Sequence, residues 1–226
     1  MGSLAKSTVA LNGTGKLSAY LSRPNDTVPR SAMIVIHEWW GLSPHMKDVA
    51  DRFASLGYVA LAPDLFRGVS TTVREEAMKL SASVNTKDSA EIIGTALDYL
   101  KQTDFVNPDR IGLTGFCFGG MHEFNFICVS PGIKAAAIYY PSRIPSEELL
   151  AKIRAPLLII YGDQDASIKA AYELEGTLKR LDKEAKLVVY PGCGHAFFND
   201  TWQNYKPEAA QDAWKKTTTF FASHLS

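Results

Sequence analysis

The chain has 226 residues, of which 46% are hydrophobic and 21% are charged, and this composition indicates one compact domain over residues 1–226. Its 24 basic and 24 acidic side chains balance, so no net field attracts nucleic acid or an anionic membrane surface. We therefore expect a small-molecule partner, no nucleic acid and no membrane, while the sequence carries no signal for the oligomeric state.

The cysteines and the apolar runs bear on compartment and cofactors. Cys117, Cys128 and Cys193 are an odd number without CxxC spacing, which argues against a disulfide framework and against a zinc site. The start of the chain has no apolar run typical of an export signal, and no later run is long enough to span a membrane. Free thiols fit a reducing compartment, so we expect a cytoplasmic protein. No phosphate loop or metal-ligand cluster is visible, so we expect no cofactor.

The first half of the chain alternates predicted strands and helices. Strands are predicted where apolar residues alternate with polar ones or form short continuous runs, and helices where they recur every three or four positions. The predicted strands are 16–22, 32–37, 58–63 and 110–114. The predicted helices are 44–56, 74–80 and 88–100.

The second half continues the same alternation to its end. The predicted helices are 121–128, 146–153, 168–181 and 207–224. The predicted strands between them are 135–140, 156–161 and 186–190. Regular alternation predicts an α/β fold, with a mostly parallel central sheet and helices on both faces.

A glycine-rich turn at residues 115–120, GFCFGG, joins a predicted strand to a predicted helix. This is the pattern of the nucleophile elbow of the α/β-hydrolase fold, with Cys117 where GxSxG has its serine. The glycines keep side-chain bulk away from crowded backbone. The positive end of the following helix favours a thiolate at Cys117. For this motif alone, the alternative is a buried structural cysteine before a glycine-rich turn.

Two further loops follow predicted strands, where parallel sheets place their ligands. Asp165 ends the stretch GDQD, and His195 lies in PGCGHAF. Nucleophile, acid and histidine then come in the order of an α/β-hydrolase triad. We predict that Cys117 attacks a carbonyl, that His195 holds the thiolate and protonates the leaving group, and that Asp165 orients His195.

Alternatives remain within this triad. Asp163 could replace Asp165 as the acid, although Asp165 is preferred because it closes the Gly-x-x-Asp pattern. Cys193 is a second thiol near His195, but it has no elbow of its own. Ordinary packing or surface roles are expected for the other histidines, which are His37, His45, His122 and His224.

A glutamate follows the first buried strand, in the stretch HEWWG at residues 37–41. α/β-Hydrolases place an oxyanion-hole loop at this point. The neighbouring tryptophans indicate that Glu38 is buried, and the alternative is a strand-end carboxylate in solvent. A carboxylate near Cys117 would oppose the thiolate and hold the neutral thiol, which would be an inactive state.

Four motifs together make the sequence resemble the dienelactone hydrolase family from about residue 17 to about residue 221: HExxG, the GxCxGG elbow, GxxD and GHxF. The resemblance implies a triad of Cys117, Asp165 and His195. It also implies that backbone N–H groups of Trp39 and Phe118 bind the oxyanion. It further implies that Glu38 gates the thiol and releases it when substrate binds.

The resemblance weakens at the substrate site. Family members that open dienelactones hold the substrate carboxylate between two arginines, and only Arg74 matches, because Asn199 stands at the second position. Losing one such contact costs about 1.5–3 kcal/mol, so affinity for an anionic lactone should fall more than affinity for a neutral ester. Met78 stands where some members have a tyrosine that lines the site.

Apolar and aromatic residues near the predicted site suit an apolar acyl or aryl group. The predicted lining residues are Trp39, Trp40, Met78, Tyr140, Phe197, Phe198 and Trp202. Core packing is the alternative for each of them singly. We therefore expect a cysteine-dependent hydrolase of ester or lactone bonds. The alternatives are a thiol-sensing or ligand-binding protein on the same fold, or a hydrolase of thioesters, peptides or cyclic imides.

Overall fold

A computed structural model of the protein describes residues 3–11 and 16–226. The chain forms two compact units, Met1–Leu113 and Thr114–Ser226, and the boundary between them falls inside strand β5 (Val106–Phe116). The first two residues of the chain, which belong to the stretch without an apolar run, lie outside the described residues. Within the described ranges, no helix is both long enough and apolar enough to cross a membrane.

The first unit contains four strands before β5: β1 (Leu4–Ala10), β2 (Ser18–Pro24), β3 (Arg30–Ile36) and β4 (Val59–Pro63). Their hydrogen-bonded order is β1-β2-β4-β3. The β1–β2 and β2–β4 pairs are antiparallel, whereas β3 and β4 are parallel. The parallel pair is the part of this unit that the continuous apolar runs predicted.

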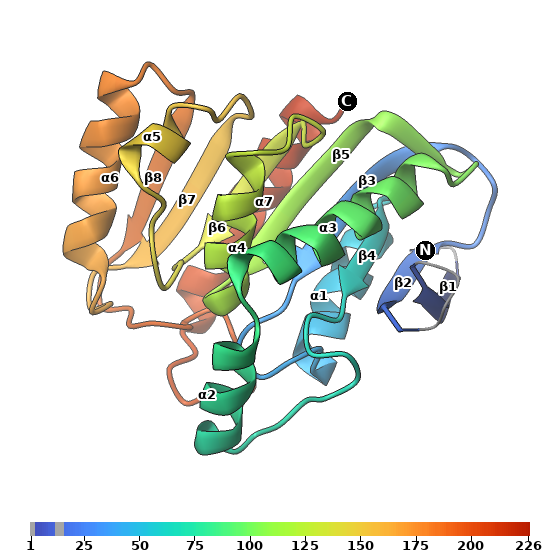
Figure 1. The fold of residues 1–226 in the computed structure, drawn as a ribbon, viewed down its shortest axis with the longest axis horizontal. Helices are drawn as coiled ribbons and strands as arrows, with labels where there is room; N and C mark the ends of the chain where they lie inside the picture. Colours follow the sequence, from blue (N-terminus) through green and yellow to red (C-terminus); the bar gives the residue numbers. More distant parts are fainter. Residues whose placement is uncertain (1–2, 12–15) are drawn as a thin grey trace. The chain divides into compact units, whose positions relative to one another are not determined.

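Three helices belong to this unit: α1 (Pro44–Ser55), α2 (Arg74–Ser83) and α3 (Thr86–Lys101). Both α1 and α3 pack on β3 and β4. Every residue of β4 is buried, so both faces of this strand are covered. Helix α2 instead buries only Ala77. Figure 1 shows this helix set away from strands β3 and β4.

The second unit repeats the alternation of helix and strand. Its elements after β5 are α4 (Phe118–Ile127), β6 (Ala135–Tyr139), α5 (Glu147–Leu150), β7 (Leu157–Gly162), α6 (Ile168–Arg180), β8 (Ala185–Tyr190) and α7 (Pro207–His224). Strands β6, β7 and β8 are parallel and adjacent in that order. Both α4 and α7 pack on β6, whose residues are all buried. The loops that leave the carboxyl ends of these strands therefore start from one edge of the sheet.

The structure differs from the predicted elements at two places. Strand β1 was not predicted, because its central residues are exposed and it is held mainly by pairing with β2. Helix α5 is a single turn rather than the eight-residue helix predicted over 146–153. Elsewhere the predicted helices and strands are present with shifted ends. One example is α3, which begins earlier because the Asn85 side chain accepts hydrogen bonds from the N–H groups of Lys87 and Asp88.

Candidate active site

Cys117 is the single residue between β5 and α4, at the turn that the glycine-rich motif predicted. Its backbone has φ 55° and ψ −112°, which is a strained conformation for a residue with a side chain. Its N–H donates to the Tyr139 carbonyl oxygen at 3.0 Å. Because Cys117 is partly exposed, the fold presents this thiol to solvent at the start of a helix.

Gly115 provides the space that the sharp turn requires. A Cβ atom at Gly115 would lie 2.6 Å from the carbonyl oxygen of Gly119 and 2.9 Å from Oε2 of Glu123. Both distances are shorter than any real contact of a Cβ atom. The crowding that the sequence predicted at this position is therefore present, and a larger residue would push apart β5 and the first turn of α4.

Asp165 follows β7 and is buried with 4% of its surface exposed. Its Oδ2 lies 2.6 Å from Nδ1 of His195. Its Oδ1 accepts hydrogen bonds from the Ser167 hydroxyl at 2.6 Å and from the Ser167 N–H at 2.9 Å. Burial opposes the charge, but the hydrogen bonds from His195 and Ser167 outweigh it and lower the pKa of Asp165. Asp165 is therefore an ionised carboxylate fixed on both oxygens.

His195 follows β8 and contacts both other members of the predicted triad. Burial alone would lower the pKa of the ring, but hydrogen bonds and charge interactions with Asp165 and Cys117 raise it to about 10. The His195 carbonyl oxygen accepts from Nδ2 of Asn204 at 3.0 Å, which fixes the backbone of the loop. The structure thus brings Cys117, His195 and Asp165 into one hydrogen-bonded chain, in which the raised pKa of His195 favours the charged imidazolium.

Asp163 and Cys193, the alternatives for the acid and the nucleophile, have other environments. Asp163 is exposed, and its Oδ1 accepts from the Gly192 N–H at 2.8 Å, so it joins two loops rather than contacting His195. Cys193 is buried, and burial raises the pKa of its thiol. Of the two aspartates, only Asp165 is hydrogen-bonded to the imidazole.

Backbone strain gathers around these residues. Among the residues with described backbone, five non-glycine residues have positive φ, and three of them are Cys117 (55°), Tyr140 (36°) and Ala196 (60°), the residue after His195. Tyr140 also lies with its ring centroid 5.0 Å from that of His195. Strained conformations persist where the surroundings hold them, and they cluster at functional sites. The strain here is consistent with a preorganised site.

Several residues predicted to line the substrate pocket are tightly packed. Tyr140, Phe197, Phe198 and Asn199 expose between 0% and 3% of their surface. The Tyr140 and Phe197 ring centroids are 5.8 Å apart. Oδ1 of Asn199 accepts from the N–H and hydroxyl of Thr201, at 3.0 and 2.7 Å. These side chains have the environment of core residues, which was the alternative considered for the aromatic ones.

Of the remaining predicted residues, Phe118 and Trp202 belong to the second unit, where Phe118 is buried and Trp202 is exposed, and the others belong to the first unit. Glu38 is 2% exposed, so the solvent-exposed alternative for this carboxyl is wrong. Trp40 is also buried, Trp39 is partly exposed, and their ring centroids are 4.9 Å apart. Arg74 and Met78 lie on α2 and are exposed.

His37 holds the backbone next to Glu38. Its Nδ1 lies 2.6 Å from the Glu38 carbonyl oxygen, and its Nε2 accepts from the Leu65 N–H at 3.1 Å. These partners assign a neutral ring with the proton on Nδ1, in agreement with a pKa lowered by burial. The packing role expected for His37 is therefore specific: it ties the end of β3 to the loop after β4.

Sequence reasoning missed Ser167 and Asn204, which fix Asp165 and the His195 loop. The spacing of Asp165 and Ser167 is a signal that could have identified Ser167, because an aspartate side chain often accepts a hydrogen bond from the N–H group two residues later. Asn204 is held near His195 only by the path of the loop, so no local pattern marks it.

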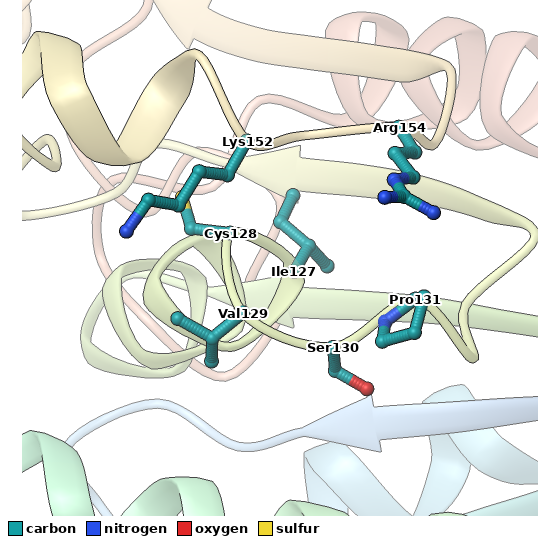
Figure 2. Close-up of a pocket in the computed structure, with 7 residues that line it drawn as sticks. All are labelled: Ile127, Cys128, Val129, Ser130, Pro131, Lys152 and Arg154. Atoms are coloured by element: carbon teal, nitrogen blue, oxygen red, sulfur yellow. The ribbon is translucent and has the colours of Figure 1, made fainter.

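A separate groove of about 400 Å³ lies in the second unit, between the end of α4 and the segment before β7. Figure 2 shows its lining residues, which are Ile127, Cys128, Val129, Ser130, Pro131, Lys152 and Arg154. The charged ends of Lys152 and Arg154 point apart rather than toward one point. None of the predicted site residues lines this groove.

Iodoacetamide at about pH 7 should alkylate Cys117 alone. Cys117 is partly exposed and hydrogen-bonded to His195, whereas burial raises the pKa of Cys193, and that of Cys128 to about 11. Peptide mass mapping of the native protein after brief labelling checks this. Labelling of Cys193 at a comparable rate would contradict the assignment, and labelling of the denatured chain at all three thiols is the control.

Comparison with known proteins identifies the family of the chain. The sequence profile of the dienelactone hydrolase family matches residues 17–225. A candidate carboxymethylenebutenolidase of Methylorubrum extorquens is 31% identical over 93% of this chain and 78% of its own length. A candidate 2-oxo-3-(5-oxofuran-2-ylidene)propanoate lactonase of a Bradyrhizobium species is 32% identical over 96% of this chain and 93% of its own.

Solved structures show the same fold. The crystal structure of a candidate dienelactone hydrolase from Klebsiella pneumoniae is 25% identical and superposes with a TM-score of 0.89, covering 98% of this chain and 99% of that one. The predicted α/β-hydrolase fold is therefore confirmed, as is the resemblance drawn from the four motifs. The chain is a hydrolase that belongs to the dienelactone hydrolase family.

Proposed function

We propose that the protein hydrolyses carboxylic ester or lactone bonds through an acyl-enzyme intermediate on Cys117. The observation that carries this proposal is the hydrogen-bonded chain from Asp165 through His195 to Cys117, with 2.6 Å between the first two side chains. An ion pair of thiolate and imidazolium supplies a nucleophile and an acid in one site. A binding protein has no need of this arrangement.

The proposed reaction has two stages. The thiolate of Cys117 attacks the carbonyl carbon, a C–S bond forms, and the carbonyl electrons move to oxygen. The tetrahedral intermediate then expels the alkoxide, which takes a proton from His195. In the second stage neutral His195 removes a proton from water, the hydroxide attacks the thioester, and the C–S bond breaks to release the acid. Asp165 keeps the ring oriented and stabilises its charge in both stages.

The oxyanion and gating roles rest on the family resemblance. We propose that backbone N–H groups of Phe118 and Trp39 bind the oxyanion, where preorganised donors act strongly. Phe118 is the first residue of α4, at the positive end of the helix. Glu38 is proposed to hold the thiol neutral in the absence of substrate, and its burial favours such a role over a solvent-facing one.

We further propose one catalytic domain over residues 1–226, because the family match runs through both compact units. A small-molecule substrate fits the family. The free state of all three cysteines, each of which the structure describes, fits the proposed cytoplasmic location.

Trapping of the acyl-enzyme tests the function directly. The protein is mixed with p-nitrophenyl acetate or with a dienelactone, quenched in acid, and its peptides are weighed. With p-nitrophenyl acetate we expect a burst of nitrophenol and an acetyl group on the peptide that contains Cys117. With a dienelactone we expect the mass of the opened lactone on the same peptide. Prior alkylation should abolish acylation by either substrate. Alkylation of Cys117 without any acylation or turnover would overturn the proposal and favour the thiol-sensing alternative. Acylation at another residue would refute the assigned nucleophile.

Substrate preference should show the effect of having one arginine. Arg74→Ala should lower kcat/KM for an anionic dienelactone by about 10- to 150-fold, because a charge-assisted contact is worth about 1.5–3 kcal/mol. It should leave kcat/KM for p-nitrophenyl acetate within about twofold. Lys79→Ala removes the same charge from the same exposed helix and is the matched control. Equal losses for the two substrates would show that Arg74 does not recognise the carboxylate.

A further inference from the structure

Glu123 is a buried acid that the proposed reaction does not use. It lies on α4, the helix that begins directly after Cys117, and none of its surface is exposed. Within the described part of the chain, neither of its carboxyl oxygens has a hydrogen-bond partner of acceptable geometry. Native proteins rarely bury a carboxyl group in this state, because removing it from water without a partner is costly. The position therefore requires an explanation.

The carboxyl group lies against the nucleophile elbow. Oε2 of Glu123 would be 2.9 Å from a Cβ atom at Gly115, so the carboxyl fills the space that the missing side chain of Gly115 leaves. Gly115 also packs against the carbonyl of Gly119. One residue separates Gly115 from Cys117. The Glu123 carboxyl group thus packs against the backbone segment from Gly115 to Cys117, whose strained conformation exposes the thiol.

The surroundings of Glu123 favour the uncharged form of its carboxyl group. Burial raises the pKa of Glu123 well above its usual value of 4.5, and the Gly115 N–H opposes this only in part. No charged side chain contributes to the shift. The other titratable side chain on α4 is His122, Cys117 directly precedes this helix, and Tyr139 is the titratable residue of β6, which packs against it. Burial raises the pKa of Tyr139, so its hydroxyl is neutral as well.

We propose that Glu123 is a positioning residue, which as an uncharged carboxylic acid packs under the elbow and holds Cys117 in its reactive conformation. This inference rests on the proposed function of Cys117. The neutral acid adds no negative charge beside the thiolate. The ionised acid would oppose the thiolate and would draw water into the packed turn, which would loosen it.

The test compares three variants over about pH 6 to pH 9. Glu123→Gln keeps the size and cannot ionise, Glu123→Ala removes the support, and Glu173→Gln on exposed α6 is the matched control. The readouts are Tm, the rate of Cys117 alkylation by iodoacetamide, and kcat. The first two need no hydrolytic activity, so a failure of this inference is distinguishable from a failure of the proposed function.

The sign of the pH effect follows from linkage. The folded protein keeps the Glu123 proton above pH 4.5, whereas the unfolded chain loses it, so folding stability falls as pH rises through this window. Each unit of pKa difference corresponds to about 3–5 °C in Tm for a chain of this size. We therefore expect Tm to decrease with rising pH in both proteins. The decrease in the parent should exceed the decrease in Glu123→Gln by at least the shift for one pKa unit. Glu173→Gln should follow the parent.

The kinetic readouts separate positioning from simple stability. Glu123→Gln should keep kcat within about twofold at pH 7 and should alkylate faster than the parent at pH 9. Glu123→Ala should lower kcat by roughly 10²-fold even where it is folded, as expected for a misplaced reacting group. Parallel pH dependence of Tm and alkylation in the parent and Glu123→Gln would overturn the inference. So would full activity in a folded Glu123→Ala variant. If the Ala variant does not fold, the Gln comparison decides alone.

Discussion

Replacement of Cys117 by alanine is expected to lower kcat/KM for a neutral aryl ester by at least roughly 10³-fold. The alanine has no group that can form the C–S bond, and only binding and oxyanion stabilisation would remain. The change should leave folding intact, because Cys117 is partly exposed and alanine keeps its backbone N–H, which donates to Tyr139. Initial rates at several ester concentrations, with Tm as a folding check, measure the effect.

Two variants serve as controls for this prediction. Cys193→Ser changes the second thiol near His195 and should keep activity within about threefold, because Cys193 is buried and is not part of the triad. Cys117→Ser should retain little activity, since a hydroxyl paired with an imidazolium is a weaker nucleophile than a thiolate. An alanine variant as active as the parent would refute Cys117 as the nucleophile.

Asp165→Asn should lower kcat by roughly 10⁴-fold, the order of the effect when a triad aspartate becomes asparagine. The amide no longer stabilises a charged His195, whose pKa of about 10 depends on its hydrogen bonds to Asp165 and Cys117. The same loss should slow the alkylation of Cys117 at about pH 6, because the thiolate loses its charged partner. Stopped-assay kinetics and timed labelling measure the two effects on one preparation.

Asp163→Asn is the matched control for Asp165. It changes the same residue type in the same loop, and Asp163 accepts from Gly192 rather than from His195. We expect its kcat to stay within about twofold of the parent and only a small loss of stability, because one exposed hydrogen bond is weakened. Equal losses of kcat in Asp163→Asn and Asp165→Asn would mean that a disturbed loop, and not the loss of the Asp165 carboxylate, lowers the activity.

The sequence alone was sufficient for features that are local. Apolar periodicity located the helices and strands of both units apart from β1, because it reflects which face of each element is buried. The turn at Cys117 was predictable because its crowding acts over a few residues, as the contact between Gly115 and the Gly119 carbonyl shows. The chain order of Cys117, Asp165 and His195 was informative because parallel strands place the following loops at one edge.

Other features depended on the tertiary structure. The choice between Asp163 and Asp165 is decided by the path of the loop after β7, which brings Asp165 to His195 and Asp163 to the N–H of Gly192. Strand β1 is held by pairing with β2, which leaves little trace in its own residues. Tyr140 was predicted to face substrate but packs on His195, because a side chain's neighbours come from elements distant in sequence.

Glu123 shows the limit most clearly. From the sequence it is an ordinary charged residue in a short helix, and such residues usually face solvent. The structure buries that helix on nearly every side and directs the carboxyl group against Gly115. The sequence predicted a helix shortly after the nucleophile, from residue 121, and in the structure it begins at Phe118. Only packing decided that an acid, whose pKa is raised by burial, lies beneath the turn that carries Cys117.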